Sequence, residues 1–278
     1  MTDSEVLRLR SVAHTDPGLQ RDNNEDSGYL SARLLVVADG MGGHAYGEVA
    51  SATAIGILAE LDRELADDAE SGVDLLDALG SAITVISDRL TDLAMDDPEL
   101  ATMGTTVTAL FWDGTSRFAI GHIGDSRAYL LRKDQFGQLT RDHTLVQSLV
   151  DEGKITPEQA VNHPRRSVLM RALQSGGSAE PDLYPWQAAV GDRYLLCSDG
   201  LTDVVPDELI GQVLASVADP DDAVATLIEL AKQGGGPDNI TCVLSDIVES
   251  ADEEPGEPII IGAAAGNRPE TDEPAARA

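Results

Sequence analysis

The sequence predicts an α+β fold in which antiparallel sheets pack on each other and helices cover the outside. Three observations support this prediction. Strands and helices come in separate groups along the chain. The Asp113-Gly114 pair predicts a tight antiparallel hairpin, and the apolar run over residues 34–38 predicts a buried strand. A doubly wound parallel sheet is the alternative, but it would require strict alternation of strands and helices.

The first half of the chain begins with strands and continues with helices. Residues 6–13 alternate weakly and predict a strand, and residues 28–39 predict a hairpin whose second strand is buried. Apolar residues recur at helical spacing over residues 48–65 and 73–95, so we expect two amphipathic helices there.

The second half returns to strands and then to helices. We expect strands at residues 105–112, 117–123, 127–132, 191–199 and 240–248, and helices at residues 206–216 and 221–233. Residues 144–173 predict a mixed, mainly helical insert. Within it, Thr156, Pro157 and Gln159 predict a helix start with a capping box.

We therefore expect a folded domain over residues 1–248 and a different kind of segment after it. Residues 249–278 are rich in Pro, Glu, Asp, Ala and Gly, which predicts a disordered acidic tail or linker. Inside that segment, the apolar stretch at residues 258–261 either docks on the domain or has no structural role.

The 278-residue chain carries a formal net charge of −30. Residues 249–278 hold eight acidic and two basic side chains, so most of the negative charge belongs to the predicted domain. Such a surface repels nucleic acid and anionic membranes, because duplex binding depends on basic contacts to phosphate. We therefore expect no nucleic-acid partner and no membrane contact from this chain itself.

Cysteine usage and apolar runs indicate the compartment. The two cysteines, Cys197 and Cys242, lie in apolar runs and predict buried, reduced thiols. No apolar run reaches the roughly 20 residues that cross a bilayer. The N-terminus also lacks the basic-then-apolar order of a signal peptide. We therefore expect a cytoplasmic protein.

Acidic residues stand beside several predicted strands. Apolar runs end at or just before three aspartates, Asp39, Asp125 and Asp199, and Asp238 shortly precedes the final apolar run. In antiparallel sheets these carboxylates can converge on one edge, together with the polar cluster at residues 21–26. Carboxylates brought together need protonation or a cation. Oxygen ligands without clustered His or Cys select Mg²⁺ or Mn²⁺. Taken singly, an Asp-Gly pair is more often a turn.

Six segments carry a more specific signal. They read RDNNED (21–26), VADGMGGHAYGEVAS (37–51), MGTT (103–106), GHIGDSRAYLL (121–131), LLCSDGLTDVV (195–205) and GGPDNIT (235–241). In this order they resemble the metal-dependent protein phosphatase family, also called protein phosphatase 2C, in its bacterial branch. The resemblance covers roughly residues 9–248. It implies a four-layer αββα sandwich with two metal ions at one end of the paired sheets.

The resemblance also implies roles for the matching residues. Asp39 would bridge two Mn²⁺ or Mg²⁺ ions. Asp199 and Asp238 would complete one metal site, and Glu25 with the carbonyl oxygen of Gly40 would complete the other. Arg21, whose guanidinium donors suit phosphate, would hold the substrate and act with the three aspartates as a catalytic residue.

Three further residues match positions of the family. Asp125 and Asp203 correspond to ligands of a third ion that bacterial members often bind, and Asn239 is a candidate for positioning a metal-bound water.

One position departs from the pattern: Met41 follows Asp39-Gly40 where eukaryotic members have a His that acts as leaving-group acid. His44 is near in sequence, but a helix-start or packing role is the simpler interpretation. The leaving-group acid would then be a metal-bound water.

The implied function is that of a protein serine/threonine phosphatase. Phosphoserine and phosphothreonine would be hydrolysed by direct attack of a metal-bridging water, and no phosphoenzyme would form. Its partners would be phosphorylated proteins, including Ser/Thr kinases and their substrates, and the chain would act as a monomer. Residues 144–173 match the mobile flap beside the active site.

Three other classes of protein are alternatives to a metal-dependent protein phosphatase. A cysteine phosphatase needs an Arg six residues after its thiolate, but Asp203 and Val248 stand at those positions. A regulatory pseudo-enzyme of the same fold and a two-metal phosphodiesterase stay open. The complete acidic set disfavours the pseudo-enzyme, and the negative charge disfavours the phosphodiesterase.

Related phosphatases continue from an acidic linker like residues 249–278 into a membrane span. The chain is thus either a soluble relative or the cytoplasmic domain of a membrane-anchored protein.

Histidines and one arginine are expected to serve the fold. His122 lies in a predicted strand, and His143 and His163 bracket the flap. Ser126 and Arg127 follow Asp125 and are expected to support the hairpin and to pair with nearby acids.

Overall fold

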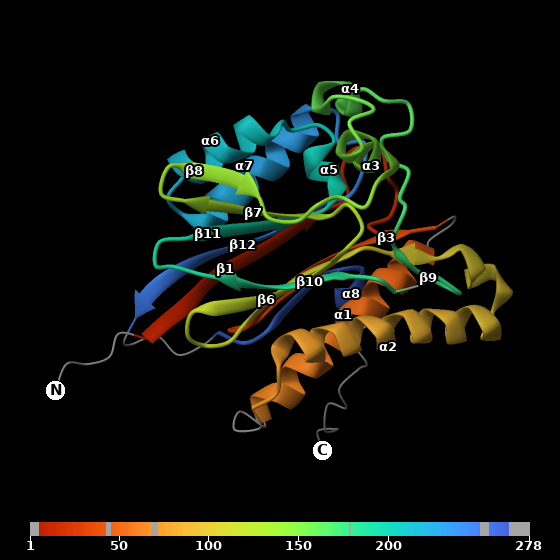
Figure 1. The fold of residues 1–278 in the computed structure, drawn as a ribbon, viewed down its shortest axis with the longest axis horizontal. Helices are drawn as coiled ribbons and strands as arrows, with labels where there is room; N and C mark the ends of the chain where they lie inside the picture. Colours follow the sequence, from red (N-terminus) through yellow and green to blue (C-terminus); the bar gives the residue numbers. More distant parts are fainter. Residues whose placement is uncertain (1–5, 43–45, 68–71, 178, 251–255, 267–278) are drawn as a thin grey trace, which may run out of the picture.

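Two antiparallel sheets face each other in the computed structural model, which describes residues 6–42, 46–67, 72–177, 179–250 and 256–266 (Figure 1). The first sheet has the strand order β1 (Val6–Asp16), β12 (Ile240–Ser250), β11 (Arg193–Cys197), β7 (Arg127–Arg132) and β8 (Gln135–Gln138). The second has the order β10 (Asp182–Gln187), β6 (Arg117–Ile123), β5 (Val107–Trp112), β3 (Leu34–Met41), β2 (Asp26–Leu30) and β13 (Ile259–Gly262). Two short strands, β4 (Gly104–Thr105) and β9 (Leu173–Gln174), extend it from β3.

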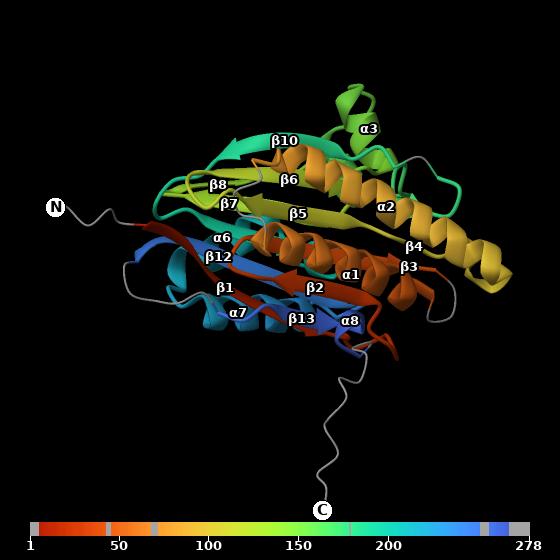
Figure 2. The same cartoon turned by 90° about the horizontal axis from the view of Figure 1, so that it is seen from below.

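Helices cover the outer face of each sheet. On the second sheet lie α1 (Tyr46–Asp67) and α2 (Leu75–Asp96), which cross β5, β3 and β2 in Figure 2. On the first sheet lie α6 (Asp207–Ser216) and α7 (Pro220–Gln233). The short helices are η1 (Pro98–Thr102), α3 (Leu145–Asp151), α4 (Pro157–Val161), α5 (Asp199–Thr202) and α8 (Ala263–Gly266). This arrangement confirms the predicted four-layer αββα sandwich.

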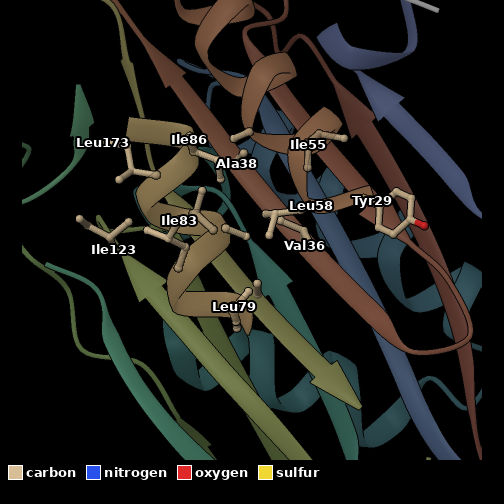
Figure 3. Close-up of a cluster of buried hydrophobic side chains, with 14 of the residues drawn as sticks. Tyr29, Val36, Ala38, Ile55, Leu58, Leu79, Ile83, Ile86, Ile123 and Leu173 are labelled. Carbon is tan, nitrogen blue, oxygen red and sulfur yellow. The ribbon is translucent and has the colours of Figure 1, made fainter. Parts of the chain in front are cut away.

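Strand β3 shows why these layers form. Its apolar run is buried on both faces, as expected for a strand between two layers. Leu35 and Val37 pack between the two sheets, in a core that also receives residues from β11 and β12. Val36 and its neighbours on the other face pack against α1 and α2, where Leu58 and Ile83 lie in Figure 3. The alternation of side chains along the strand thus supplies two separate cores.

The insert after β8 is mixed rather than mainly helical: α3 and α4 are its helices among residues 144–173, and turns and loop segments make up most of the rest. Thr156 caps α4, accepting from the backbone N–H of Gln159, whose side chain accepts from the backbone N–H of Thr156. Pro157 occupies the first turn, so the predicted capping box is confirmed.

The loop at Asp113-Gly114 differs in detail from the tight hairpin that the sequence predicts. Strands β5 and β6 are antiparallel, but residues 113–116 form a four-residue connection. The Asp113 carboxylate accepts the backbone N–H groups of Thr115, Ser116 and Arg117. The aspartate therefore organises the whole loop rather than a two-residue turn.

The segment after β12 contains ordered structure that its composition does not predict. Strand β13 pairs with β2, and α8 follows it directly. Ile261 packs over Gly28, where any side chain on the glycine would overlap it. Of the two alternatives for residues 258–261, docking on the domain is therefore the one that the structure adopts.

The cysteines and helices bear on the expected compartment. Cys197 and Cys242 are free, buried and opposite each other in the β11–β12 register. Among the described residues, no helix is both long enough and apolar enough to span a bilayer.

Candidate active site

Five acidic residues from separate segments line one pocket at an end of the sandwich. Its volume is about 240 Å³, and its acidic residues are Glu25, Asp39, Asp125, Asp199 and Asp238. Glu25 directly precedes β2, Asp199 begins α5 after β11, and Asp238 precedes β12. The structure thus brings together the carboxylates that the sequence places at strand ends. Arg21 and Gly40 also line the pocket, and Ser167 and Leu169 of the insert border it.

Two threonines hold the backbone of Asp39. The Asp39 N–H donates to the hydroxyl of Thr106 at 3.0 Å, and the Thr106 N–H donates back to the Asp39 carbonyl at 2.9 Å. The Thr105 hydroxyl donates to the same carbonyl oxygen. Ser126 in turn hydrogen-bonds Thr106. The MGTT segment therefore fixes the central aspartate of the pocket from the neighbouring strand.

Close backbone packing explains the glycines after Asp39. A Cβ atom on Gly40 would overlap the carbonyl oxygens of Gly47 and Glu25, and a Cβ on Gly47 would overlap the Glu25 carboxylate. The start of α1 can therefore approach Glu25 and Gly40 only because neither glycine has a side chain.

Asp26 is a buried acid that the sequence analysis did not single out. It is 1% exposed, it pairs with Asp39 across the β2–β3 ladder, and its carboxylate accepts the Ser198 hydroxyl. Burial, together with the nearby charges of Asp238 and Glu25, raises the pKa of Asp26 to about 6. Its position after Glu25 in the polar cluster was the available signal, but the cluster does not say which acid is buried.

Asn239 serves the loop that carries Glu25. Its side-chain oxygen accepts the Glu25 N–H at 2.8 Å, and its amide nitrogen donates to the carbonyls of Pro17 and Asn23. The side chain is 5% exposed and does not line the pocket. The structure therefore shows this side chain as a support for the loop that carries Glu25, and a role in positioning a metal-bound water stays a prediction.

The electrostatics of the pocket favour a bound cation. Burial is the main cause that raises the pKa of Asp39 well above its ordinary value, and the charges of Asp26 and Asp199 raise it further. Burial and Asp125 do the same to the pKa of Asp199. Burial and Asp142 raise the pKa of Asp125 to about 7. These shifts mean that the ionised groups destabilise one another unless positive charge lies among them.

The donor set suits a hard divalent ion. Carboxylates and one accessible backbone carbonyl are oxygen donors, which Mg²⁺ and Mn²⁺ prefer. No three acidic, histidine or cysteine side chains among the described residues are arranged to hold an ion by themselves. An ion here would therefore complete its coordination with water, as Mg²⁺ commonly does.

Arg21 is the basic group of the pocket. Its guanidinium donates to the Asp238 carboxylate at 2.6 Å, and its side chain is about half exposed. An exposed guanidinium at the rim can exchange this carboxylate for another anion, because both offer two oxygens to its donors.

Asp203 lies apart from the pocket lining. Its carboxylate accepts Arg166 of the insert at 3.0 Å. Asp125, expected to act with it, does line the pocket. The structure thus ties the insert to one of the two expected third-site residues.

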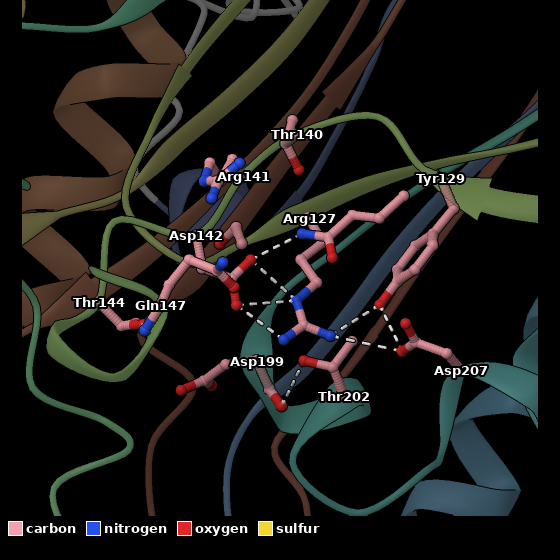
Figure 4. Close-up of polar contacts among 12 residues, drawn as sticks. Arg127, Tyr129, Thr140, Arg141, Asp142, Thr144, Gln147, Asp199, Thr202 and Asp207 are labelled. Carbon is pink, nitrogen blue, oxygen red and sulfur yellow. Dashed lines mark hydrogen bonds and ion pairs between the residues drawn. The ribbon is translucent and has the colours of Figure 1, made fainter. Parts of the chain in front are cut away.

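Arg127 links the base of the insert to α6 beside Asp199 (Figure 4). It donates to Asp142 at 2.7 Å and to Asp207 at 3.4 Å, and it also hydrogen-bonds the Tyr129 hydroxyl. This network confirms that Arg127 pairs with local acids rather than lining the pocket.

The described histidines lie outside the pocket lining. His122 and His143 are buried, with ring centroids 4.6 Å apart. His143 accepts the Gly124 N–H and contacts Asp182 at 3.1 Å. His163 accepts the backbone N–H of Arg165. These contacts agree with structural roles. His44 lies outside the described residues.

Comparison with known proteins gives a family and several relatives. Residues 4–149 match the family described as protein phosphatase 2C. The Mycobacterium tuberculosis serine/threonine protein phosphatase PstP is 50% identical over 262 residues, which are 94% of this chain and 49% of that protein. The chain thus spans about half the length of that relative. The serine/threonine phosphatase stp of Listeria innocua is 37% identical over 85% of this chain and 95% of its own.

Solved structures agree with these sequence matches. A crystal structure of the M. tuberculosis phosphatase PstP/Ppp superposes with a TM-score of 0.82 at 51% identity, covering 87% of this chain and all of that one. The catalytic domain of PstP in complex with two manganese ions superposes with a TM-score of 0.79 at 49% identity, with the same coverage. The motif set also predicts similarity to the actinobacterial phosphatase PstP, which these matches confirm.

Proposed function

The chain belongs to the protein phosphatase 2C family, and we propose that it is the catalytic domain of a metal-dependent protein serine/threonine phosphatase. One observation carries this proposal: five carboxylates and one rim guanidinium, delivered by segments far apart in sequence, share a single pocket. The two manganese ions of the similar PstP catalytic domain support the same assignment.

We assign the metal-binding roles as follows. Asp39 would contact two ions, Asp199 and Asp238 would complete one metal site, and Glu25 with the Gly40 carbonyl would complete the other. All five residues line the pocket, and Asp39 and Gly40 lie in strand β3. Either Mn²⁺ or Mg²⁺ suits these donors.

A third ion would involve Asp125 and Asp203. Asp125 reaches the pocket, whereas Asp203 would have to leave Arg166 of the insert. Binding of that ion is therefore linked to the position of the insert.

The chain's own residues bind and orient the phosphate. Arg21 donates to the phosphate oxygens in place of Asp238. Gly40 and Gly47 allow the start of α1 to pack closely against Glu25 at the pocket. Ser167 and Leu169 border the entrance, so the insert contacts whatever flanks the phosphorylated residue. When bound, the two ions supply an activated water and neutralise charge that develops on the phosphate. A water also serves as leaving-group acid, since Met41 has no proton to give.

The proposed substrates are phosphoserine and phosphothreonine in proteins, including Ser/Thr kinases and their targets. The chain as a whole is strongly negative, and Arg21 at the pocket rim supplies local positive charge that attracts phosphate. We place the domain on the cytoplasmic side and expect it to act as a monomer.

The test measures phosphate release from p-nitrophenyl phosphate and from a phosphothreonine peptide, with Mn²⁺ and with EDTA. Asp39→Asn should abolish turnover. Asp113→Asn is the matched control, because this aspartate also precedes a glycine but organises a distant loop. Turnover that requires Mn²⁺ and is lost only in Asp39→Asn supports the phosphatase. Folded chain that binds Mn²⁺ without turnover on either substrate would mean a binding module.

A further inference from the structure

A second cavity lies at the opposite end of β2 from Asp26. Its volume is about 440 Å³, and it lies between the edge strand β1, the turn after β2 and the segment that leads into β13. Figure 2 shows β1 and β13 on the same side of the molecule. We call this space the edge cavity. Nothing in the phosphatase chemistry uses it.

The lining of the edge cavity combines apolar and basic side chains. Leu7, Leu30, Trp112 and Ile259 are among its apolar residues. Its basic residues are Arg8, Arg10 and Arg33. Three of the 19 basic residues of a chain with net charge −30 thus meet at one small cavity. A volume of several hundred Å³ with mainly apolar walls and few polar groups is typical of small-molecule sites.

Two of the three arginines already have carboxylate partners. Arg10 pairs with Asp219 at 3.0 Å, and Arg33 donates to the Asp62 carboxylate and to backbone carbonyls at the end of α1. These contacts already use donors of both guanidinium groups. Arg8 is the one of the three for which no carboxylate partner is present among the described contacts.

Arg8 carries a buried nitrogen without an acceptor. Its Nη1 atom is shielded from solvent and has no hydrogen-bond partner among the residues that the structure describes. A guanidinium is always charged and offers five donors, so leaving one of them buried and unpaired is costly. Native structures seldom keep such a group unless a water, an ion or a ligand supplies the acceptor.

We propose that the edge cavity binds a small amphipathic anion, with one carboxylate or phosphate group on Arg8 and an apolar chain or ring against Leu7, Leu30 and Trp112. The guanidinium selects the anionic group, because paired oxygens match its donors. The apolar wall selects the rest of the ligand by burial. A purely polar anion leaves the wall in contact with water, and a neutral apolar molecule leaves Arg8 unpaired.

The site is joined to the active-site end through β13. Ile259 forms part of the cavity wall and is the first residue of that strand. At the other end of β13, Gly262 packs directly on the Asp26 carbonyl. A ligand that fills the cavity therefore also stabilises the docked position of β13.

The chain's own Glu257 is the competing occupant. It lines the cavity, but its side chain is exposed and no ion pair between it and Arg8 is present among the described contacts. The free ligand is therefore the better-supported acceptor, and Glu257 is tested beside it.

Calorimetric titration of the metal-loaded chain with octanoate, acetate and octanol tests the proposal. We expect measurable binding of octanoate and at least tenfold weaker binding of acetate and of octanol, which carry only the charge or only the chain. Arg8→Gln should weaken octanoate binding at least tenfold. Arg63→Gln, which removes the same charge from an exposed pair with Glu60, should not change it.

Further readouts separate this role from a structural one. Without ligand, Arg8→Met should keep or raise the melting temperature, because it removes a buried nitrogen that has no acceptor. Octanoate should slow amide exchange of residues 259–262. Glu257→Gln should leave octanoate binding unchanged. Phosphatidylglycerol vesicles, tested by sedimentation, should not retain the chain through Arg8.

Each opposite result overturns the proposal. Equal octanoate affinity in Arg8→Gln would exclude the guanidinium, and equal affinity for octanol would show a merely apolar site. Octanoate binding that appears only in Glu257→Gln would assign the cavity to the chain's own carboxylate. Arg8-dependent retention on vesicles, without octanoate binding, would assign it to membrane lipid.

Discussion

The carboxylate of Asp26 accepts a 2.7 Å hydrogen bond from the hydroxyl of Ser198, and this bond crosses from one sheet to the other. Asp26 begins β2 in the second sheet, and Ser198 follows β11 in the first. The Ser198 hydroxyl also accepts the Thr241 N–H at the start of β12. One small side chain thus ties together the strand ends that deliver Glu25, Asp199 and Asp238.

Removal of this hydroxyl should loosen the proposed metal site. In Ser198→Ala, Asp26 keeps its burial but loses a donor, so we expect the free energy of unfolding to fall by about 1–3 kcal/mol. We also expect a higher Mn²⁺ concentration for half-maximal phosphatase activity. Urea unfolding and a Mn²⁺ titration measure the two effects. Ser216→Ala, on the exposed end of α6, is the control and should change neither.

Replacement of Arg21 should weaken substrate binding. A hydrogen-bonded charge is worth roughly 1.5–3 kcal/mol, so Arg21→Gln should lower kcat/KM for a phosphopeptide by about ten- to a hundredfold. Most of the change should appear in KM, with Mn²⁺ affinity little altered. Arg117→Gln, at the exposed start of β6, provides the comparison. An unchanged KM in Arg21→Gln would remove this residue from the phosphate site.

His122 should make the fold sensitive to mild acid. Burial, with the adjacent His143 ring, lowers the pKa of His122 to about 4, against 6.5 in an unfolded chain. The neutral ring is favoured in the folded state, so its contribution is complete above pH 6.5 and is lost as the pH falls toward 4. Between pH 7.5 and 5 this loss is on the order of 2 kcal/mol.

The comparison with His122→Gln isolates that contribution. We expect the variant to be less stable at pH 7.5, because the bonds from the ring to Thr108 and to the Arg141 carbonyl are changed. Its free energy of unfolding should nevertheless fall less between pH 7.5 and 5 than that of the parent chain. Urea unfolding at both values measures the difference. Parallel losses in the two proteins would show that other groups dominate.

Loss of the α4 capping box should destabilise the insert locally without changing the global stability of the domain. Thr156→Ala removes the side-chain bond to the Gln159 N–H, which is worth about 1 kcal/mol in other helices. We expect amide exchange over residues 157–161 to accelerate severalfold while the melting temperature stays constant. A matching fall in melting temperature would mean that the insert unfolds together with the sandwich.

The layers of this fold follow from features that a sequence displays directly. Residues 34–38 are apolar on both faces of a strand, and the helices of residues 46–67 and 75–96 carry an apolar side. Strand β10 is harder to predict. It has Pro185 in its middle, which a central strand would not tolerate but an edge strand paired only with β6 can. Strand β13 is also hard to predict, because the segment around it is acidic and rich in proline.

The residues of the proposed active site also fall into those that the sequence predicts and those that it does not. The strand-end position of Asp39, Asp125, Asp199 and Asp238 predicts that they meet, and they line one pocket. The burial of Asp26 depends on how two sheets meet, which no local pattern encodes. The same holds for Asn239, whose amide is used by backbone groups more than 200 residues away in sequence.

The pairing of β1 with β12 has a consequence for synthesis of the protein. These strands join Val6 to Ser250 and Asp16 to Ile240 in one continuous ladder. Contacts of such sequence separation form late and slowly, since the intervening chain must be closed first. During translation β1 therefore waits for its partner until residue 250 has left the ribosome. Arg21 and Asp238 lie just beyond the end of this ladder where Asp16 pairs with Ile240, so we expect the proposed site to be completed late in synthesis.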